Sequence, residues 1–139
     1  MTRNRELWNH LQEAADEEVD HLSWCEDRLA QLGSAPSKLT PLWYAGSYTI
    51  GAIAGFAGDK WSLGFIEETE KQVTAHLESH LQKLPKSDER SRTILTQMRK
   101  DEMEHAESAH EAGAADLPLP VKKAMTEVAK IMTKLSFKI

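Results

Sequence analysis

The chain has 139 residues, 40% of them hydrophobic and 28% charged, and is predicted to fold as one domain over residues 1–139. Its 22 acidic and 17 basic residues give a net charge of −5, which argues against nucleic acid as the main partner. The single cysteine, Cys25, excludes an internal disulfide framework and a CxxC zinc site. No basic and apolar leader pattern opens the sequence, so we expect an intracellular protein.

Glycine and proline divide the chain into five lengths that each suit a helix. We expect these helices at about residues 3–32, 40–58, 60–84, 88–112 and 118–139. Gly33 is the expected C-terminal residue of the first, and Thr40 and Ser87 are the expected N-caps of the second and fourth. Alternation with a period of two residues is rare, so the predicted fold class is all-α without a sheet.

Three of these helices carry an apolar stripe that is interrupted near its middle by ionisable side chains. The stripes are Leu7, Leu11, Ala14, Glu18, His21, Cys25, Leu29 and Leu32; Ile66, Glu70, Val73, Leu77, Leu81 and Leu84; and Leu95, Met98, Glu102, His105, Ala109 and Ala112. Burying carboxylates and imidazoles without partners costs several kcal/mol. Three helices with this costly pattern at a similar depth indicate a common partner.

Two of the stripes contain a Glu-x-x-His motif, Glu18–His21 and Glu102–His105. A spacing of three residues places the carboxylate and the imidazole on one helix face, one turn apart. A third copy, Glu107–His110, lies off the inward stripe and is predicted to lie on a solvated face. The first two copies, together with Glu70 on a third helix, therefore form the specific signal.

Carboxylate and imidazole ligands together suit iron or manganese, and the sequence offers no set of thiolates. Two Glu-x-x-His helices, with single glutamates from two others, form the di-metal site of ferritin-like bundles. The sequence therefore predicts an all-α ferritin-like helical bundle with metal ligands Glu18, His21, Glu70, Glu102 and His105. A buried Glu–His ion-pair network that joins three helices is the alternative.

Several segments extend this pattern over nearly the whole chain. They are Glu17-Glu-Val-Asp-His-Leu, Leu42-Trp-Tyr-Ala-Gly, Gly51-Ala-Ile-Ala-Gly, Glu70 with His76, Met98-Arg-Lys-Asp-Glu-Met-Glu-His, and Pro-Val-Lys and Met-Thr-Lys in the tail. With them the sequence resembles the demethoxyubiquinone hydroxylase family, the di-iron monooxygenases of ubiquinone biosynthesis. The resemblance implies an enzyme that uses dioxygen and two irons to hydroxylate the ring of a demethoxylated polyprenyl quinol, as a 3-demethoxyubiquinol 3-hydroxylase does.

The resemblance also implies a role for each site residue. Glu18 and Glu102 would bridge two irons, His21 would bind one iron and His105 the other, and Glu70 would be a terminal ligand. The catalytic residue His76 would lie close to the metals, where it orients a ligand or assists proton movement. Two alternatives stay open for each of two further residues. Asp101 either hydrogen-bonds a ligand imidazole or is solvated, and His80, four residues after His76, either supports the metal ligands from outside or is a surface histidine.

One departure from the family concerns the ligand set. The family has an earlier helix with a further ligating glutamate, and no matching motif occurs in this sequence. Five of the six expected ligands are present, so the expected bundle is N-terminally incomplete, and water or another subunit would fill the gap if the chain is not a shortened product. A non-enzymatic ferritin-like metal-binding or interaction module is the alternative function.

Two segments favour contact with a membrane surface. The twenty uncharged residues 39–58 suit a bilayer span, an interfacial segment or a plain core helix, of which the span fits least because the segment is rich in glycine. Residues 117–139 hold five lysines and one glutamate beside an apolar face. By the resemblance we expect a peripheral protein on the cytoplasmic side of the inner membrane, within a homo-oligomer or a ubiquinone-biosynthesis complex.

Overall fold

The computed structural model describes the backbone of residues 2–139 and the side chains of residues 5–139, which form five helices and no strand. The helices are α1 (Thr2–Gln31), α2 (Thr40–Phe56), α3 (Asp59–Lys83), α4 (Glu89–Glu111) and α5 (Leu119–Lys138). The all-α prediction is confirmed, and every boundary lies within about two residues of the expected one, which is the usual uncertainty at helix ends.

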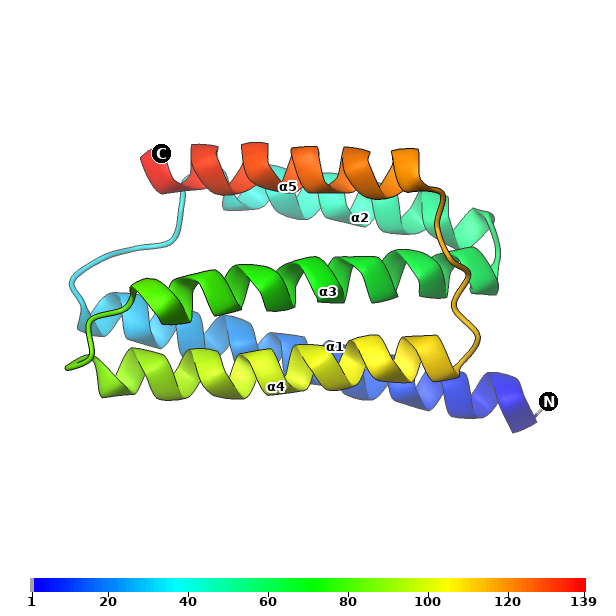
Figure 1. Ribbon diagram of the computed structural model, residues 1–139, viewed down its shortest axis with the longest axis horizontal. Coiled ribbons are helices and arrows are strands. Elements are labelled where there is room, and N and C mark those ends of the chain that lie inside the picture. The colour runs from blue at the N-terminus through cyan, green and yellow to red at the C-terminus, as the bar shows by residue number, and fades with distance from the viewer. Residues whose placement is uncertain (1) are drawn as a thin grey trace.

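The helix α3 lies in the middle of the molecule. In Figure 1, α1 and α4 lie on one side of α3, and α2 and α5 lie on the other. α3 packs most extensively against α4, α4 also packs against α1, and both α2 and α5 contact α3. The three helices with interrupted apolar stripes are therefore neighbours, while α2 and α5 form a separate outer layer.

The buried apolar core is small and follows the α3–α4 pair. It consists of Leu63, Leu77, Leu81, Ala106, Ala109, Ala115 and Leu117. α2 and α5, both fully described, contain no buried residue. The predicted stripes are only partly buried, since Leu11, Leu32 and Ala112 are exposed. Leu11 and Leu32 are exposed because α1 packs mainly against α4 and leaves the rest of its apolar face uncovered.

The start of α4 also fixes the position of α1. The N-cap is Asp88 rather than the expected Ser87, and its carboxylate accepts a hydrogen bond from the Ser91 backbone N–H at 3.1 Å. The same carboxylate accepts from the Arg28 guanidinium at 2.9 Å, and Arg28 also donates to the Ser91 hydroxyl at 2.9 Å. This link between α1 and α4 sets the register of the two Glu-x-x-His helices.

At the start of α2 the expected cap is one residue out of place. Thr40 lies within the helix, and the N-cap is Leu39, which supplies no side-chain cap. The Thr40 hydroxyl instead donates to the Ser37 carbonyl at 2.7 Å. A threonine beside Pro41 therefore stabilises the preceding turn and not the first turn of the helix.

The loop after α4 crosses α3 at Gly64. A Cβ atom at this position would collide with the Ala115 carbonyl oxygen, so only glycine permits the approach. The Ala115 backbone N–H donates to the Lys60 carbonyl at 2.9 Å. This crossing directs the chain from α4 to α5, on the other side of α3.

Candidate metal centre

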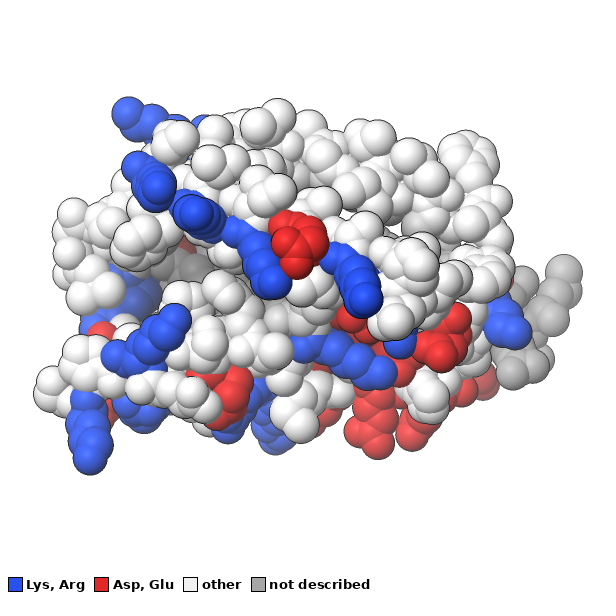
Figure 2. All heavy atoms as spheres, turned by 45° about the horizontal axis from the view of Figure 1, so that its top comes forward, with Lys and Arg blue, Asp and Glu red and all other residues white. Residues whose placement is uncertain are grey.

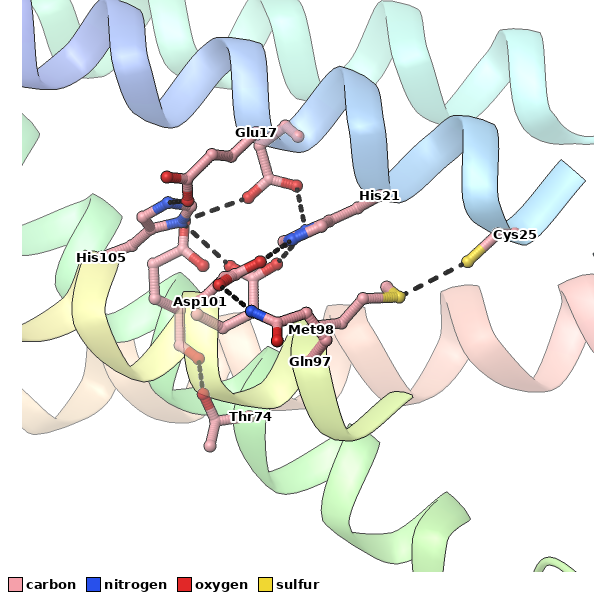
Figure 3. Close-up of polar contacts among 11 residues, drawn as sticks. Glu17, His21, Cys25, Thr74, Gln97, Met98, Asp101 and His105 are labelled. Carbon is pink, nitrogen blue, oxygen red and sulfur yellow. Dashed lines mark hydrogen bonds and ion pairs between the residues drawn. The ribbon is translucent and has the colours of Figure 1, made fainter. Parts of the chain in front are cut away.

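Five ionisable side chains from three helices meet in the middle of the bundle. Four of them, Glu18, Glu70, Glu102 and His105, can each place one ligand atom within 4.8 Å of all the others. His21 joins them, with its Nδ1 atom 2.9 Å from the Glu102 carboxylate. Figure 3 shows His21 on α1 and His105 on α4, with carboxylates between the two rings. The structure thus brings together all five ligands proposed from the sequence.

Each of two glutamates offers one oxygen to each imidazole. The Oε1 atom of Glu102 lies 2.9 Å from His21 Nδ1, and its Oε2 atom lies 3.3 Å from His105 Nδ1. Glu18 repeats the arrangement in the opposite sense, with Oε2 3.6 Å from His21 Nδ1 and Oε1 3.6 Å from His105 Nδ1. Both carboxylates therefore span the space between the two imidazoles.

Glu70 belongs to one end of this arrangement. Its carboxylate belongs to the compact set with His105, and His21 is outside that set. Burial, followed by the nearby Glu102 and Glu18 carboxylates, raises the pKa of Glu70 to about 9. Glu70 thus tends to keep its proton beside its ionised neighbours. A cation bound in the cluster would displace that proton.

The pKa shifts of the other cluster residues show that protonation of each side chain depends strongly on its neighbours. Hydrogen bonds to Glu102 and Glu18 raise the pKa of His105 to about 11. Burial tends to raise the pKa of Glu102, but hydrogen bonds with His105, Glu70 and Glu18 outweigh it and lower the pKa to about 2. The pKa of His21 is raised as well, because the Asp101 carboxylate and the nearby glutamates outweigh burial. Without a metal, extra protons keep these close carboxylates together.

The outer nitrogen of each imidazole contacts a further carboxylate. His21 Nε2 lies 2.8 Å from Asp101 Oδ2, and His105 Nε2 lies 2.7 Å from Glu17 Oε2. Gln97 donates to the other Asp101 oxygen at 2.8 Å. Both histidines therefore present Nδ1 to the cluster, with the ring orientation fixed from outside, as is usual for metal-binding histidines.

Of these two outer carboxylates, the sequence suggested Asp101 but missed Glu17. Asp101 immediately precedes Glu102, and Glu17 immediately precedes Glu18. Each acid contacts the histidine of the opposite helix. The signal that could have revealed Glu17 is this repeat: an acid before each Glu-x-x-His motif, on helices that pack face to face.

The structure does not bring His76 to the cluster. Its recorded side-chain partner is His80, and both rings are exposed on α3. The expected role of His76 beside the metals stays a prediction. The third motif copy is exposed as predicted, although His110 contacts the buried carboxylate of Glu67 at 3.0 Å.

A groove leads from the surface to the cluster between α1, α3 and α4. Its volume is about 690 Å³, and Glu70 and His105 form part of its wall. The apolar side chains along it come mostly from the interrupted stripes: Leu7, Leu11, Ala14, Leu63, Ile66, Ala109 and Ala112. The cluster is therefore accessible from this side, which is consistent with the half-exposed side chain of Glu18.

The donor set fits a pair of transition-metal ions better than an ion-pair network alone. Three carboxylates and two imidazole Nδ1 atoms converge on one volume. Such a mixture of ligands suits iron or manganese. Close carboxylates without a cation must share protons, as the raised pKa of Glu70 indicates. The fold and this cluster define the class of protein: a ferritin-like helical bundle with a carboxylate–histidine cluster suited to hold metal ions.

The comparisons with known proteins agree with this class. The chain belongs to the family described as "Ubiquinone biosynthesis protein COQ7", whose model matches residues 1–136. This match confirms the family inferred from the motifs, and with it the ferritin-like fold. No solved structure matches the chain.

Curated relatives that match the chain carry the name 3-demethoxyubiquinol 3-hydroxylase, and three of them illustrate the match. The protein of Polynucleobacter necessarius is 57% identical over the whole chain, and the match covers 66% of that relative. The protein of Chromobacterium violaceum is 59% identical over 93% of the chain and 63% of the relative. The protein of Xanthomonas axonopodis is 52% identical over the whole chain and 64% of the relative. The chain thus spans about two thirds of the length of these relatives.

Proposed function

We propose that this chain carries the di-iron centre of a 3-demethoxyubiquinol 3-hydroxylase, which uses dioxygen to hydroxylate the ring of a polyprenyl quinol. The names of the relatives support the reaction and the substrate. The observation that carries the proposal is the pair of glutamates, Glu18 and Glu102, that each direct one oxygen to each of two imidazoles. Carboxylates placed in this way are suited to bridge two ions.

The same geometry supports the proposed ligand set. Glu18 and Glu102 would bridge the ions, His21 would bind one ion through Nδ1, and His105 would bind the other. Glu70 would be a terminal ligand on the His105 side, because its carboxylate groups with His105 and not with His21. Bound iron supplies the activation of dioxygen.

The protein's own contribution is to orient these ligands and manage their protons. Asp101 and Glu17 hold the outer nitrogens of the two imidazoles, so that both Nδ1 atoms face inward. Glu70 is the acid best suited to release a proton when metal binds, since its pKa lies far above its usual value in the protonated cluster. The groove that leads to this centre combines apolar side chains with acidic ones, among them Glu6, Glu13 and Glu104.

The proposed membrane contact involves the outer layer of the molecule. α2 exposes large apolar side chains, among them Tyr44, Tyr48, Ile53 and Phe56, of which Phe56 is 93% exposed. The Trp43 indole N–H donates to the Ser136 hydroxyl at 2.8 Å, which connects α2 to α5. No helix within the described residues is long and apolar enough to cross a bilayer.

Lysines border this apolar layer. Figure 2 shows basic side chains in a row along one side of a broad uncharged face, interrupted by one acidic residue. α5 supplies Lys122, Lys123, Lys130, Lys134 and Lys138, with Glu127 among them. An apolar face with a cationic border suits peripheral binding to anionic lipid. We propose that α2 and α5 hold the protein on the bacterial inner membrane, where a polyprenyl quinol dissolves.

Iron binding and hydroxylation test the proposal separately. Anaerobic loading with ferrous iron should give close to two irons per complete site, and His21→Ala or His105→Ala should each lower that content. His110→Ala, which removes an exposed histidine outside the cluster, is the matched control and should leave it unchanged. Unchanged iron in both cluster variants would overturn the assignment and favour the ion-pair network.

Activity is then measured by complementing a strain that lacks the hydroxylase and analysing its quinones. Conversion of the demethoxylated quinone that is lost in His21→Ala and retained in His110→Ala would support the enzyme. Iron binding without any conversion, in the chain and in its longer relatives assayed alongside, would instead support the non-enzymatic metal-binding module.

A further inference from the structure

Outside the cluster, two histidines form a close pair on the exposed surface of α3. His76 and His80 are one helical turn apart, and their Nε2 atoms lie 3.0 Å from each other. The rings meet edge to face, with centroids 4.4 Å apart and an interplanar angle of 87°. The two Nε2 atoms therefore face each other beside the helix.

This pair is separate from the proposed iron centre. His76 follows Glu70 by six residues, which is about 9 Å along the helix axis and about 120° around it. No contact joins either imidazole to the cluster among the described side chains. The pair is also absent from the compact set of cluster ligands.

The chemical state of the pair suits metal binding. Partial burial of the His76 ring, followed by the charges of His80 and Lys83, lowers the pKa of His76 below its usual value. His76 is therefore neutral at physiological pH, and neutral imidazole is the form that binds metals. Two imidazoles at positions i and i+4 on one helix face are a known arrangement for holding one ion.

We propose that His76 and His80 form a second metal site, a two-imidazole chelate that binds Cu²⁺ and Ni²⁺ more tightly than Zn²⁺. Metal–imidazole bonds are about 2.0–2.1 Å long, so two nitrogens 3.0 Å apart subtend about 90° at a shared ion. Square-planar Cu²⁺ and Ni²⁺ prefer this angle, whereas tetrahedral Zn²⁺ needs a wider separation. Water fills the remaining positions, because no third ligand group accompanies the pair among the described contacts.

The alternative explanation for the 3.0 Å distance between the two Nε2 atoms is an N–H···N hydrogen bond between two neutral rings. Nickel titration by calorimetry distinguishes the two cases. Wild-type protein is compared with His80→Ala and with the double variant His80→Gln, Gln82→His. The double variant keeps six histidines but places one imidazole six residues after His76, about 120° away around the helix. Loss of the chelate should weaken this binding event on the order of tenfold or more in both variants.

Two controls separate this site from the cluster. His110→Ala should retain the event, and His105→Ala should retain it while losing nickel bound at the cluster. Copper EPR of the wild-type site should show coupling to two imidazole nitrogens. Nickel binding that is unchanged in His80→Ala, or that disappears only in His105→Ala, would overturn the proposal. Iron content is expected to be the same in His80→Ala and wild type. If the second metal site is disproved, the proposed iron centre is therefore not affected.

Discussion

Asp101 and Glu17 perform the same task for opposite histidines, but in different surroundings. The side chain of Asp101 is 13% exposed and is held further by Gln97, whereas that of Glu17 is 47% exposed. Burial strengthens a hydrogen bond to a charged group, and solvent weakens it. The orientation of His21 should therefore depend more on its outer partner than the orientation of His105 does.

Replacing the two outer acids should reveal this difference. Asp101→Asn should lower iron affinity by about 10- to 100-fold, the usual effect of losing an outer carboxylate on a ligand histidine, and Glu17→Gln should lower it less. Iron titrations at a fixed pH measure both changes. Glu107→Gln, on an exposed carboxylate of α4, is the control. Equal losses of iron affinity in Asp101→Asn and Glu17→Gln would show that burial does not govern the strength of these contacts.

At the scale of the helix, α5 combines an apolar face with lysines near its end. Each lysine close to an anionic membrane contributes about 1 kcal/mol, which corresponds to about fivefold in binding. Lys134→Gln and Lys138→Gln should therefore each weaken binding to anionic vesicles by about fivefold, and added salt should reduce the difference. Flotation with vesicles of defined composition measures the effect.

Lys86→Gln serves as the control for α5, because Lys86 lies in the loop between α3 and α4. Its loss should not change flotation. If neutral and anionic vesicles bind wild-type protein equally well at every salt concentration, the lysines take no part. In that case only the apolar side chains of α2 and α5 remain as a basis for membrane contact.

The helices themselves were largely predictable, because glycine and proline mark their ends and period-3.6 stripes mark their faces. That these five ionisable side chains lie together was predictable for the same reason: a carboxylate or imidazole is conspicuous in an apolar stripe. Burial was less predictable, since Leu11 and Leu32 continue the stripe of α1 and are nevertheless exposed. A sequence shows which face of a helix is apolar but not how far a neighbouring helix covers it. The contact of Glu17 depends on packing between α1 and α4, which periodicity alone does not encode.

The uncharged segment illustrates the same limit. Its composition left a span, an interfacial segment and a core helix open, and α2 proves to have no buried residue. The core-helix alternative is therefore wrong for the described chain. Composition alone could not decide this, because it depends on whether α2 fits between other helices or lies on their outer side.

For the whole molecule, the shared protons of the cluster predict a particular pH dependence of the metal-free stability. His105 has a pKa of 6.5 when unperturbed and about 11 in the fold, so its contribution is complete below pH 6.5 and is lost as the pH rises toward 11. Glu70, raised from 4.5 to about 9, loses its contribution between those values. Glu102, lowered from 4.5 to about 2, loses its contribution as the pH falls through that range.

The thermal midpoint of metal-free protein should therefore be highest near pH 4.5, should fall up to pH 6.5 as the Glu70 contribution is lost, and should fall more steeply toward pH 9 as the His105 contribution is lost as well. Iron or manganese should reverse the alkaline decline, because metal replaces the shared protons and its affinity rises as they leave. Thermal melts across this pH range, with and without metal, measure both effects. Glu70→Gln should flatten the decline between pH 4.5 and 9, and an unchanged slope in that variant would show that Glu70 does not hold the proton.

The absence of buried side chains in α2 and α5 has a consequence for how the molecule opens. Backbone amides exchange with solvent through local openings, and the free energy of an opening depends on the apolar contacts that it breaks. The α3–α4 pair, which contains the core, should exchange only through openings that approach global unfolding. α2 and α5 should exchange much faster and together, since Trp43 and Ser136 connect them. Lipid that covers both helices should slow their exchange selectively. Amide exchange in α2 and α5 would then report membrane binding, while exchange in the α3–α4 pair stays slow throughout.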